Sequence, residues 1–127
     1  MAAARRAFLA ELDRDEVTLG LHPEIAPFWR VVEESTALQA RLRHLRDRTE
    51  EALTETLRAE TGANAEDPMP RIAAAMLAAA DSALHAEIRR RVLAGDDPDS
   101  VRTEVRRTAE ATFDALETGL TTYAMKV

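Results

Sequence analysis

The sequence predicts an all-α protein of five helices that forms one domain over residues 1–127. Helix-forming residues dominate throughout, whereas Val, Ile and the aromatic residues are few and never alternate as they do in strands. Helix breakers divide the chain at Gly20–Pro23, Gly62–Pro70 and Gly95–Pro98. Apolar residues between these breaks recur three and four positions apart, which is typical of amphipathic helices.

Each predicted helix has its own start and stop signals. The five expected ranges are about Ala3 to Leu19 with a candidate break at Asp13 to Asp15, Pro23 to Glu34, the Ser35/Thr36 cap to near Thr61, Pro68 to Ala94, and Pro98 to Ala124. Asp67 and Asp97 each precede a proline, an order that suits an N-cap followed by the first helical residue. Gly62 and Gly95 suit left-handed C-caps.

The helix expected over Pro68 to Ala94 is apolar on two faces. One face holds Ile72, Met76, Ala79, Ala80 and Ala83, and the other holds Leu77, Leu84, Ile88 and Val92. Both faces of such a helix must be covered, and the last helix also has a broad apolar face. We therefore expect a homodimer in which the last two helices of each copy form a four-helix interface. Its predicted residues are Leu77, Asp81, Leu84, Ile88, Val92, Ala109, Phe113, Leu116 and Leu120.

Phe28 and Trp29 are adjacent in a chain with only five aromatic residues. With Ile25 and Val32 they form one stripe, which is the pattern of a core-facing helix. The alternative is a ligand cavity between helices, because such cavities are mostly apolar with a few polar groups. The residues predicted to line this cavity are Phe28, Trp29, Val32, Leu42, Leu45, Thr49, Met76 and Ala80.

Three polar residues interrupt the apolar stripes. Asp81 lies on the side of Leu77 and Leu84, where a carboxylate is costly unless it is paired or hydrated. It is interpreted either as an interface-edge acid paired with an arginine or as a polar group that points into a ligand cavity. Thr49 and Thr56 either bond the carbonyl one turn back or face the cavity.

Composition excludes several functional classes. There are 17 basic and 23 acidic residues, and a net charge of −6 disfavours nucleic-acid binding by this chain alone. The chain has no Cys, its three His lie on separate segments, and neither Glu-x-x-His nor His-x-x-x-His occurs, so no metal or cofactor is expected. Adjacent carboxylates such as Glu33-Glu34 diverge on a helix, and the sequence offers no catalytic constellation. The arginine run 89–91 is interpreted as a solvated helix end, with phosphate binding as the alternative.

The run "VVEESTALQARLRHLRDRTEEALTETLRAETG", Val31 to Gly62, resembles the TetR family of bacterial transcriptional regulators. The likeness is to their C-terminal ligand-binding and dimerisation domain, especially the branch described as binding acyl-CoA-like ligands. It rests on the Glu33-Glu34 pair, on the start Ala37, Leu38, Ala40 and Arg41, and on the end Thr61-Gly62. The segments "NAEDPMPRIAAAMLAAADSALHAEIRRRVLAGDD" and "VRRTAEATFDALETGL" follow the same helical pattern.

The family's N-terminal helix-turn-helix domain has no counterpart in this sequence. The chain is therefore expected to be a fragment, since "FLAEL" resembles part of the helix that follows that domain; the alternative is a stand-alone effector domain. The resemblance implies that the first three helices and part of the fourth surround an apolar effector, while the fourth and fifth dimerise.

We thus expect a cytoplasmic effector-sensing and dimerisation domain of a TetR-like regulator, with no membrane span and no enzymatic activity. DNA would be reached only through the missing domain. The alternative function is a helical protein-interaction module that binds neither ligand nor DNA.

Overall fold

The computed structural model describes the backbone of residues 2–13 and 23–124 and the side chains of residues 4–13 and 24–119. Within those residues the chain forms helices only. They are α1 (Ala2–Asp13), a short 3-10 turn η2 (Pro23–Ile25), α2 (Ala26–Glu34), α3 (Thr36–Thr61), α4 (Met69–Leu93) and α5 (Pro98–Ala124). The all-α prediction is confirmed. The stretch Arg14 to Leu19, which was expected to extend the first helix, lies outside the described residues.

Local signals account for most helix ends. The Ser35 hydroxyl accepts a hydrogen bond from the Leu38 N–H at 3.2 Å at the start of α3, and Gly62 ends α3 with a φ of +62°. Asp97 accepts from the N–H groups of Asp99 and Ser100 at 3.1 and 3.2 Å, which confirms it as the cap of α5. These bonds satisfy backbone groups that have no partner inside the helix.

One predicted helix is divided in two. The range Pro23 to Glu34 consists of the 3-10 turn η2 followed by α2, which begins at Ala26. Pro27 explains the division, because an α-helix that began at Pro23 would need an N–H from Pro27 to bond the Pro23 carbonyl. The proline is tolerated only where it stands, in the first turn of a new helix.

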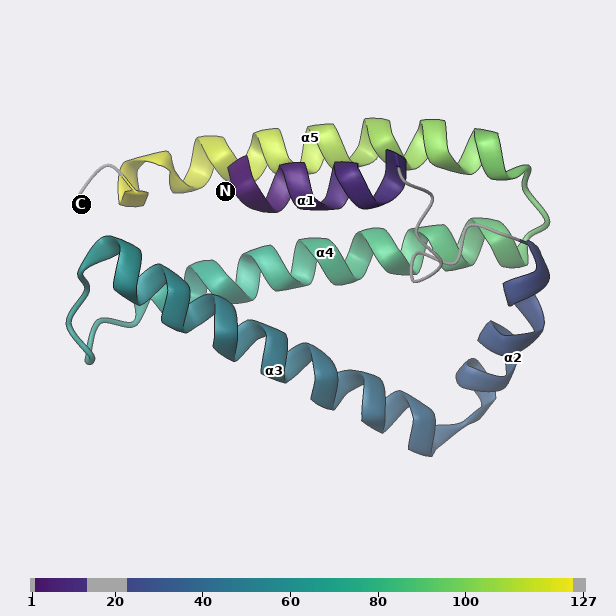
Figure 1. Cartoon of the computed structure of the whole chain (residues 1–127), viewed down its shortest axis with the longest axis horizontal. Coiled ribbons are helices and arrows are strands. Elements are labelled where there is room, and N and C mark those ends of the chain that lie inside the picture. The colour runs from purple at the N-terminus through teal and green to yellow at the C-terminus, as the bar shows by residue number, and fades with distance from the viewer. Residues whose placement is uncertain (1, 14–22, 125–127) are drawn as a thin grey trace.

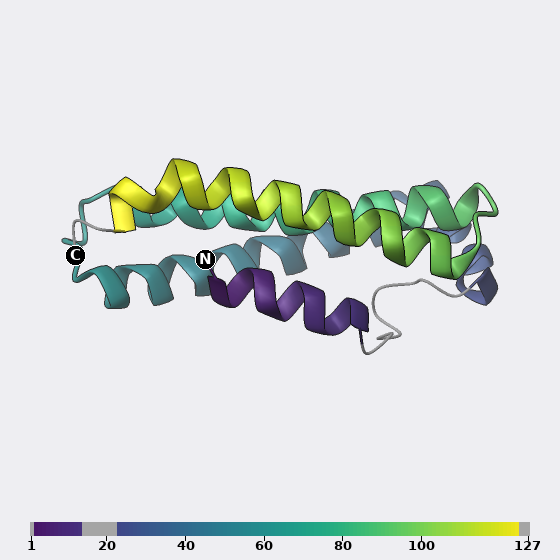
Figure 2. The same ribbon diagram turned by 90° about the horizontal axis from the view of Figure 1, so that it is seen from above.

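The helices form two antiparallel hairpins that share a central member. Figures 1 and 2 show α4 and α5 side by side and antiparallel, with α1 lying along α5. The 62–68 loop joins α3 to α4. The two helices lie close together near this loop and diverge toward the N-terminus of α3 (Figure 1). Helix α2 spans the open end of this wedge and contacts both α3 and α4.

The core lies between α1, α4 and α5. Its fully buried side chains come from all three helices, and Ala26 of α2 closes one end. The members are Phe8, Leu12, Ala26, Leu84, Ile88, Val92, Val101, Val105, Ala109 and Phe113. Leu84, Ile88 and Val92 are thus covered by helices of the same chain, chiefly α5 and α1.

This core corrects the argument that a second copy must cover the Leu84 face of α4. The other helices of the same chain are enough to cover this face, because Phe8 and Leu12 of α1 pack into the same cluster. Helix α4 nevertheless has a second apolar face, and the described part of the chain leaves this face exposed. Ile72 and Met76 are 46% and 40% exposed, and Ala79 and Ala83 are also exposed. The homodimer itself stays a prediction. The exposed apolar face of α4 is a surface through which two copies could associate.

Ion pairs hold α1 on α5. Arg5 donates to the Asp114 carboxylate at 2.6 Å, to Glu117 at 3.4 Å and to the Glu110 backbone carbonyl at 3.2 Å. The hydrogen bond with Asp114 is the main reason that the pKa of Arg5 is raised. Asp13 pairs with Arg106 at the other end of α1. Because Phe8 and Leu12 are buried between these two contacts, α1 is fixed at both ends and along its apolar side.

Candidate ligand-binding site

A mainly apolar cleft of about 420 Å3 opens where α1, α3 and α4 meet. We call it the apolar cleft. It is lined by Ala4, Ala7, Phe8 and Glu11 of α1, by Leu42, Leu45, Arg46, Thr49 and Leu53 of α3, by Leu77, Ala78, Asp81 and Ser82 of α4, and by Phe113 of α5. Its size falls within the range of about 300–1,000 Å3 that is common for small-molecule sites. The divergence of α3 from α4 creates the space, since only one half of α3 packs closely against α4.

Three of the eight residues predicted to contact a ligand line this cleft. Leu42, Leu45 and Thr49 all come from the apolar stripe of α3. The Thr49 hydroxyl donates to the Leu45 carbonyl at 3.1 Å, and Thr56 donates to the Ala52 carbonyl at 3.0 Å. The bond one turn back that was expected of both residues is therefore present. Thr49 also lines the apolar cleft, so the two interpretations given for it are compatible.

The aromatic pair lies elsewhere. Phe28 is 50% exposed, and its ring centroid is 5.1 Å from that of Trp29. Neither side chain lines the apolar cleft, whose aromatic wall consists of Phe8 and Phe113. Met76 and Ala80 also lie outside the apolar cleft. Phe113 was predicted to lie in a dimer interface, and Phe8 was not predicted as a site residue, although Phe8 and Leu12 share one face of α1.

The predicted interface residues are divided between the core and the apolar cleft. Leu84, Ile88, Val92, Ala109 and Phe113 are core residues, and Leu116 packs against them. Leu77 is buried and lines the apolar cleft. The Leu120 side chain lies outside the described part of the chain. This set therefore does not form one exposed surface.

Asp81 lines the apolar cleft, and the ligand that its second interpretation placed there stays a prediction. Its neighbour is His85 of the same helix, not an arginine: His85 Nδ1 is 3.4 Å from the Asp81 carboxylate and 2.8 Å from the Asp81 backbone carbonyl. The carbonyl only accepts, so this bond places a proton on Nδ1. His85 Nε2 lies 3.9 Å from the Glu11 carboxylate of α1, and the ring packs edge-on against Phe8 at 5.5 Å. His85 thus links α4 to α1 beside the apolar cleft.

A second, smaller hollow adjoins the apolar cleft where α2, α3 and α4 meet. This arginine pocket has a volume of about 250 Å3 and is lined by Val32, Glu33, Gln39, Leu42, Arg43, Arg46 and Arg89. It shares Leu42 and Arg46 with the apolar cleft. Val32, which was predicted to contact a ligand, is buried here. Gln39 donates to the Val32 and Glu33 carbonyls at 3.4 and 2.6 Å, joining the end of α2 to α3.

Trp29 contacts Arg89, one of the residues that line the arginine pocket. The Arg89 guanidinium carbon is 5.1 Å from the centroid of the Trp29 ring, a cation–π contact. The Trp29 Nε1–H is shielded from solvent and has no hydrogen-bond acceptor among the described residues. Burial lowers the pKa of Arg89, and the positive charge of Arg46 lowers it further, while Glu33 acts in the opposite direction.

The arginine run 89–91 is split by its surroundings. Arg90 and Arg91 both bond to Glu87, at distances of 2.6 to 2.9 Å, and only Arg89 lines the arginine pocket. Arg106 pairs with Asp13, and Arg107 lies 3.6 Å from Glu104. The solvated-end interpretation therefore describes Arg90, whereas Arg91 is half-buried against Glu87 and Arg89 lines the arginine pocket.

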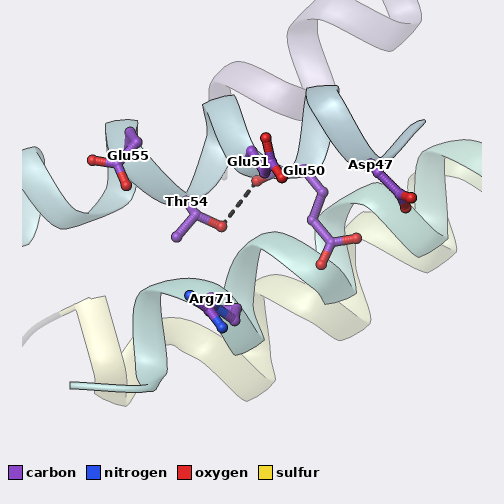
Figure 3. Close-up of a pocket in the computed structure, with 6 residues that line it drawn as sticks. All are labelled: Asp47, Glu50, Glu51, Thr54, Glu55 and Arg71. Carbon is purple, nitrogen blue, oxygen red and sulfur yellow. Dashed lines mark hydrogen bonds between the residues drawn. The ribbon is translucent and has the colours of Figure 1, made fainter. Parts of the chain in front are cut away.

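A third hollow, between α3 and the start of α4, is polar. This acidic groove has a volume of about 590 Å3 and is lined by Asp47, Glu50, Glu51, Thr54, Glu55 and Arg71. In Figure 3 the acidic side chains come from α3 and Arg71 comes from α4, and the Thr54 hydroxyl bonds the Glu50 carbonyl. Across residues 2–13 and 23–124, no group of three or more His, Asp or Glu is arranged to hold a metal ion. The described lining of the acidic groove thus consists of four carboxylates, Thr54 and Arg71.

Comparison of the chain with models of protein families, with curated proteins and with solved structures finds no match. The resemblance to TetR-type regulators thus rests on the residue patterns alone. None of the described helices combines the length and the apolar character that a membrane span needs.

Proposed function

We propose that this chain is the effector-sensing and dimerisation domain of a TetR-like transcriptional regulator, and that the apolar part of its effector binds in the apolar cleft. The observation that carries the proposal is the composition of this cleft. Leucines of α3 and α4 and two phenylalanines supply apolar surface, while Asp81, Ser82 and Thr49 supply a few polar groups. This combination is typical of small-molecule sites.

The position of α1 connects ligand binding to regulation. In TetR-type regulators the DNA-binding domain precedes the helix that α1 resembles. A ligand in the apolar cleft contacts α1 through Phe8 and α3 through Leu45, so it favours one spacing of these helices. A regulator switches when its effector binds the two spacings with different affinity.

Binding to the apolar cleft is tested with the neutral fluorescent probe N-phenyl-1-naphthylamine and its displacement by uncharged medium-chain alcohols. Leu45→Glu places a charge in the apolar cleft and is expected to weaken probe binding about tenfold or more, since burying a leucine is worth about 1.5–3 kcal/mol. Leu38→Glu is the matched control. Leu38 is 38% exposed and Leu45 45% exposed, but only Leu45 lines the apolar cleft.

The proposal fails if the wild-type chain does not bind the probe, or if both variants lose binding equally. Trp29 fluorescence is a secondary readout, because Trp29 lies outside the apolar cleft.

The alternative function, a helical interaction module, is favoured by the open face of α4. Ile72, Met76, Ala79 and Ala83 present apolar surface that no described part of the chain covers. In the sensor proposal this face belongs to the homodimer. In the alternative it is the dimerisation surface of an interaction module, and the apolar cleft stays empty. Probe binding combined with self-association supports the sensor; self-association without probe binding supports the module.

A further inference from the structure

Three arginines converge on one small hollow of an acidic protein. Arg43 and Arg46 lie one turn apart on α3, Arg89 reaches the same hollow from α4, and together they line the arginine pocket of about 250 Å3. The chain as a whole has a net charge of −6. The overall composition of an acidic chain does not explain why three positive charges gather in one pocket.

These arginines have no carboxylate partner among the described residues. Arg5, Arg58 and Arg106 each pair with an acid, whereas no ion pair within the described part of the chain involves Arg43, Arg46 or Arg89. Among the described residues, Glu33 is the only acidic one that lines the arginine pocket. Its lining side chains therefore carry three positive charges against one negative charge.

The residues around the arginine pocket favour the binding of an anion. Trp29 packs against the Arg89 guanidinium and restricts its position. The carbonyls at the end of α2 would repel an anion, but Gln39 donates to those of Val32 and Glu33, and the Ser35 N–H also donates to the Val32 carbonyl. An anion here would lie among three guanidinium groups, with Glu33 as the one acidic side chain among the described lining residues.

We propose that the arginine pocket is a binding site for a phosphate-type oxyanion. Guanidinium groups present paired N–H donors that match phosphate oxygens, and a phosphate group carries enough charge and enough oxygens to engage all three arginines. The arginine pocket adjoins the apolar cleft, but its three arginines can bind an anion whether or not the function proposed above is right. Because the two hollows share Leu42 and Arg46, the phosphate is either free or the headgroup of a molecule whose tail lies in the apolar cleft.

Calorimetry with inorganic pyrophosphate at low ionic strength tests the site. The double variant Arg43→Gln/Arg46→Gln is compared with Arg41→Gln/Arg48→Gln, which removes the same charge from exposed positions of α3 outside the arginine pocket. The first variant is expected to weaken binding at least about tenfold and the control less than about twofold, since charge-assisted hydrogen bonds are lost only in the first. Circular dichroism checks that all four substitutions leave the helices formed.

Decyl phosphate and decanol identify the source of the phosphate. If decyl phosphate binds more tightly than pyrophosphate and also responds to Leu45→Glu, the phosphate is a headgroup whose tail occupies the apolar cleft. If Leu45→Glu has no effect on either phosphate, the site takes free phosphate, and the inference stands even when decanol does not bind. The inference is overturned if neither phosphate binds, or if both double variants weaken binding equally.

Discussion

Residues of the same type contribute differently to the stability of this chain, because their helices place them in the core or on the surface. Phe113 is 2% exposed in the core between α1, α4 and α5, whereas Phe28 is 50% exposed on α2. Phe113→Ala is expected to lower the free energy of unfolding by about 3–5 kcal/mol, because it removes buried apolar surface and leaves a cavity. Phe28→Ala is expected to cost under about 1 kcal/mol. Urea denaturation of both variants measures the difference, and equal losses would contradict the placement of the core.

Glu87 gives a residue-scale prediction about pH. Its hydrogen bonds with Arg90, and then those with Arg91, lower its pKa from 4.5 to about 2 in the folded chain. A carboxyl whose pKa is lowered by folding adds stability that is fully present above its ordinary pKa and is lost as the pH falls toward the lowered value. The stability difference between the wild type and Glu87→Gln is therefore expected to be constant above about pH 5 and to shrink between about pH 4.5 and pH 2.

Denaturation curves of both proteins across that range test this pH dependence. Glu104→Gln is the control, because Glu104 has one longer contact with Arg107, at 3.6 Å. A Glu87 difference that stays the same from pH 6 to pH 3 would show that the three side chains do not form this cluster in solution.

At the scale of helices, α3 is expected to be unequal along its length. Its second half packs against α4 and holds the buried Thr54, whereas Leu38 and Leu45 of its first half are exposed. Local opening requires less free energy where fewer apolar contacts are lost. Amides 38–48 are therefore expected to exchange with deuterium about tenfold faster than amides 52–61. Adding the neutral probe should slow exchange mainly in the first half, where Leu42 and Leu45 line the apolar cleft, and uniform exchange along α3 would argue against the open cleft.

Helix positions could be predicted from the sequence because their signals are local. Asp97 caps α5 and Gly62 ends α3 as expected, since each acts on backbone groups a few positions away. Leu42, Leu45 and Thr49 line the same cleft because they share one stripe of a single helix, and ligand binding by them stays a prediction. The rest of the site depends on how helices cross. Phe8 enters the apolar cleft only because α1 lies along α5, and Phe28 and Trp29 lie outside it because α2 spans the open end of the wedge.

For the whole molecule, the sequence shows that α4 has two apolar faces but not which of them meets its own chain. Both faces have the same helical period, so periodicity cannot rank them. The larger side chains Leu84, Ile88 and Val92 are buried by α5 and α1, and the alanine-rich face stays open. Small side chains on an open face let a second copy approach closely, which is the geometry that a homodimer through α4 requires.

The neighbours Ala83 and Leu84 distinguish these two faces in one experiment. Ala83 is exposed, and Leu84 is 3% exposed in the core. If the chain dimerises through the open face of α4, Ala83→Glu is expected to give folded monomers, because two like charges would meet across the twofold axis. Leu84→Glu is expected to unfold the chain, since a buried carboxylate without a partner costs several kcal/mol.

Sedimentation velocity gives the mass and circular dichroism gives the helical content of each variant. The dimer proposal requires wild-type dimers, folded monomers of Ala83→Glu and loss of helix in Leu84→Glu. A wild-type chain that sediments as a monomer over the whole concentration range refutes it. Folded monomers of Leu84→Glu would instead support the dimer interface first predicted through Leu84. A core residue could not accept that charge and leave the helices intact.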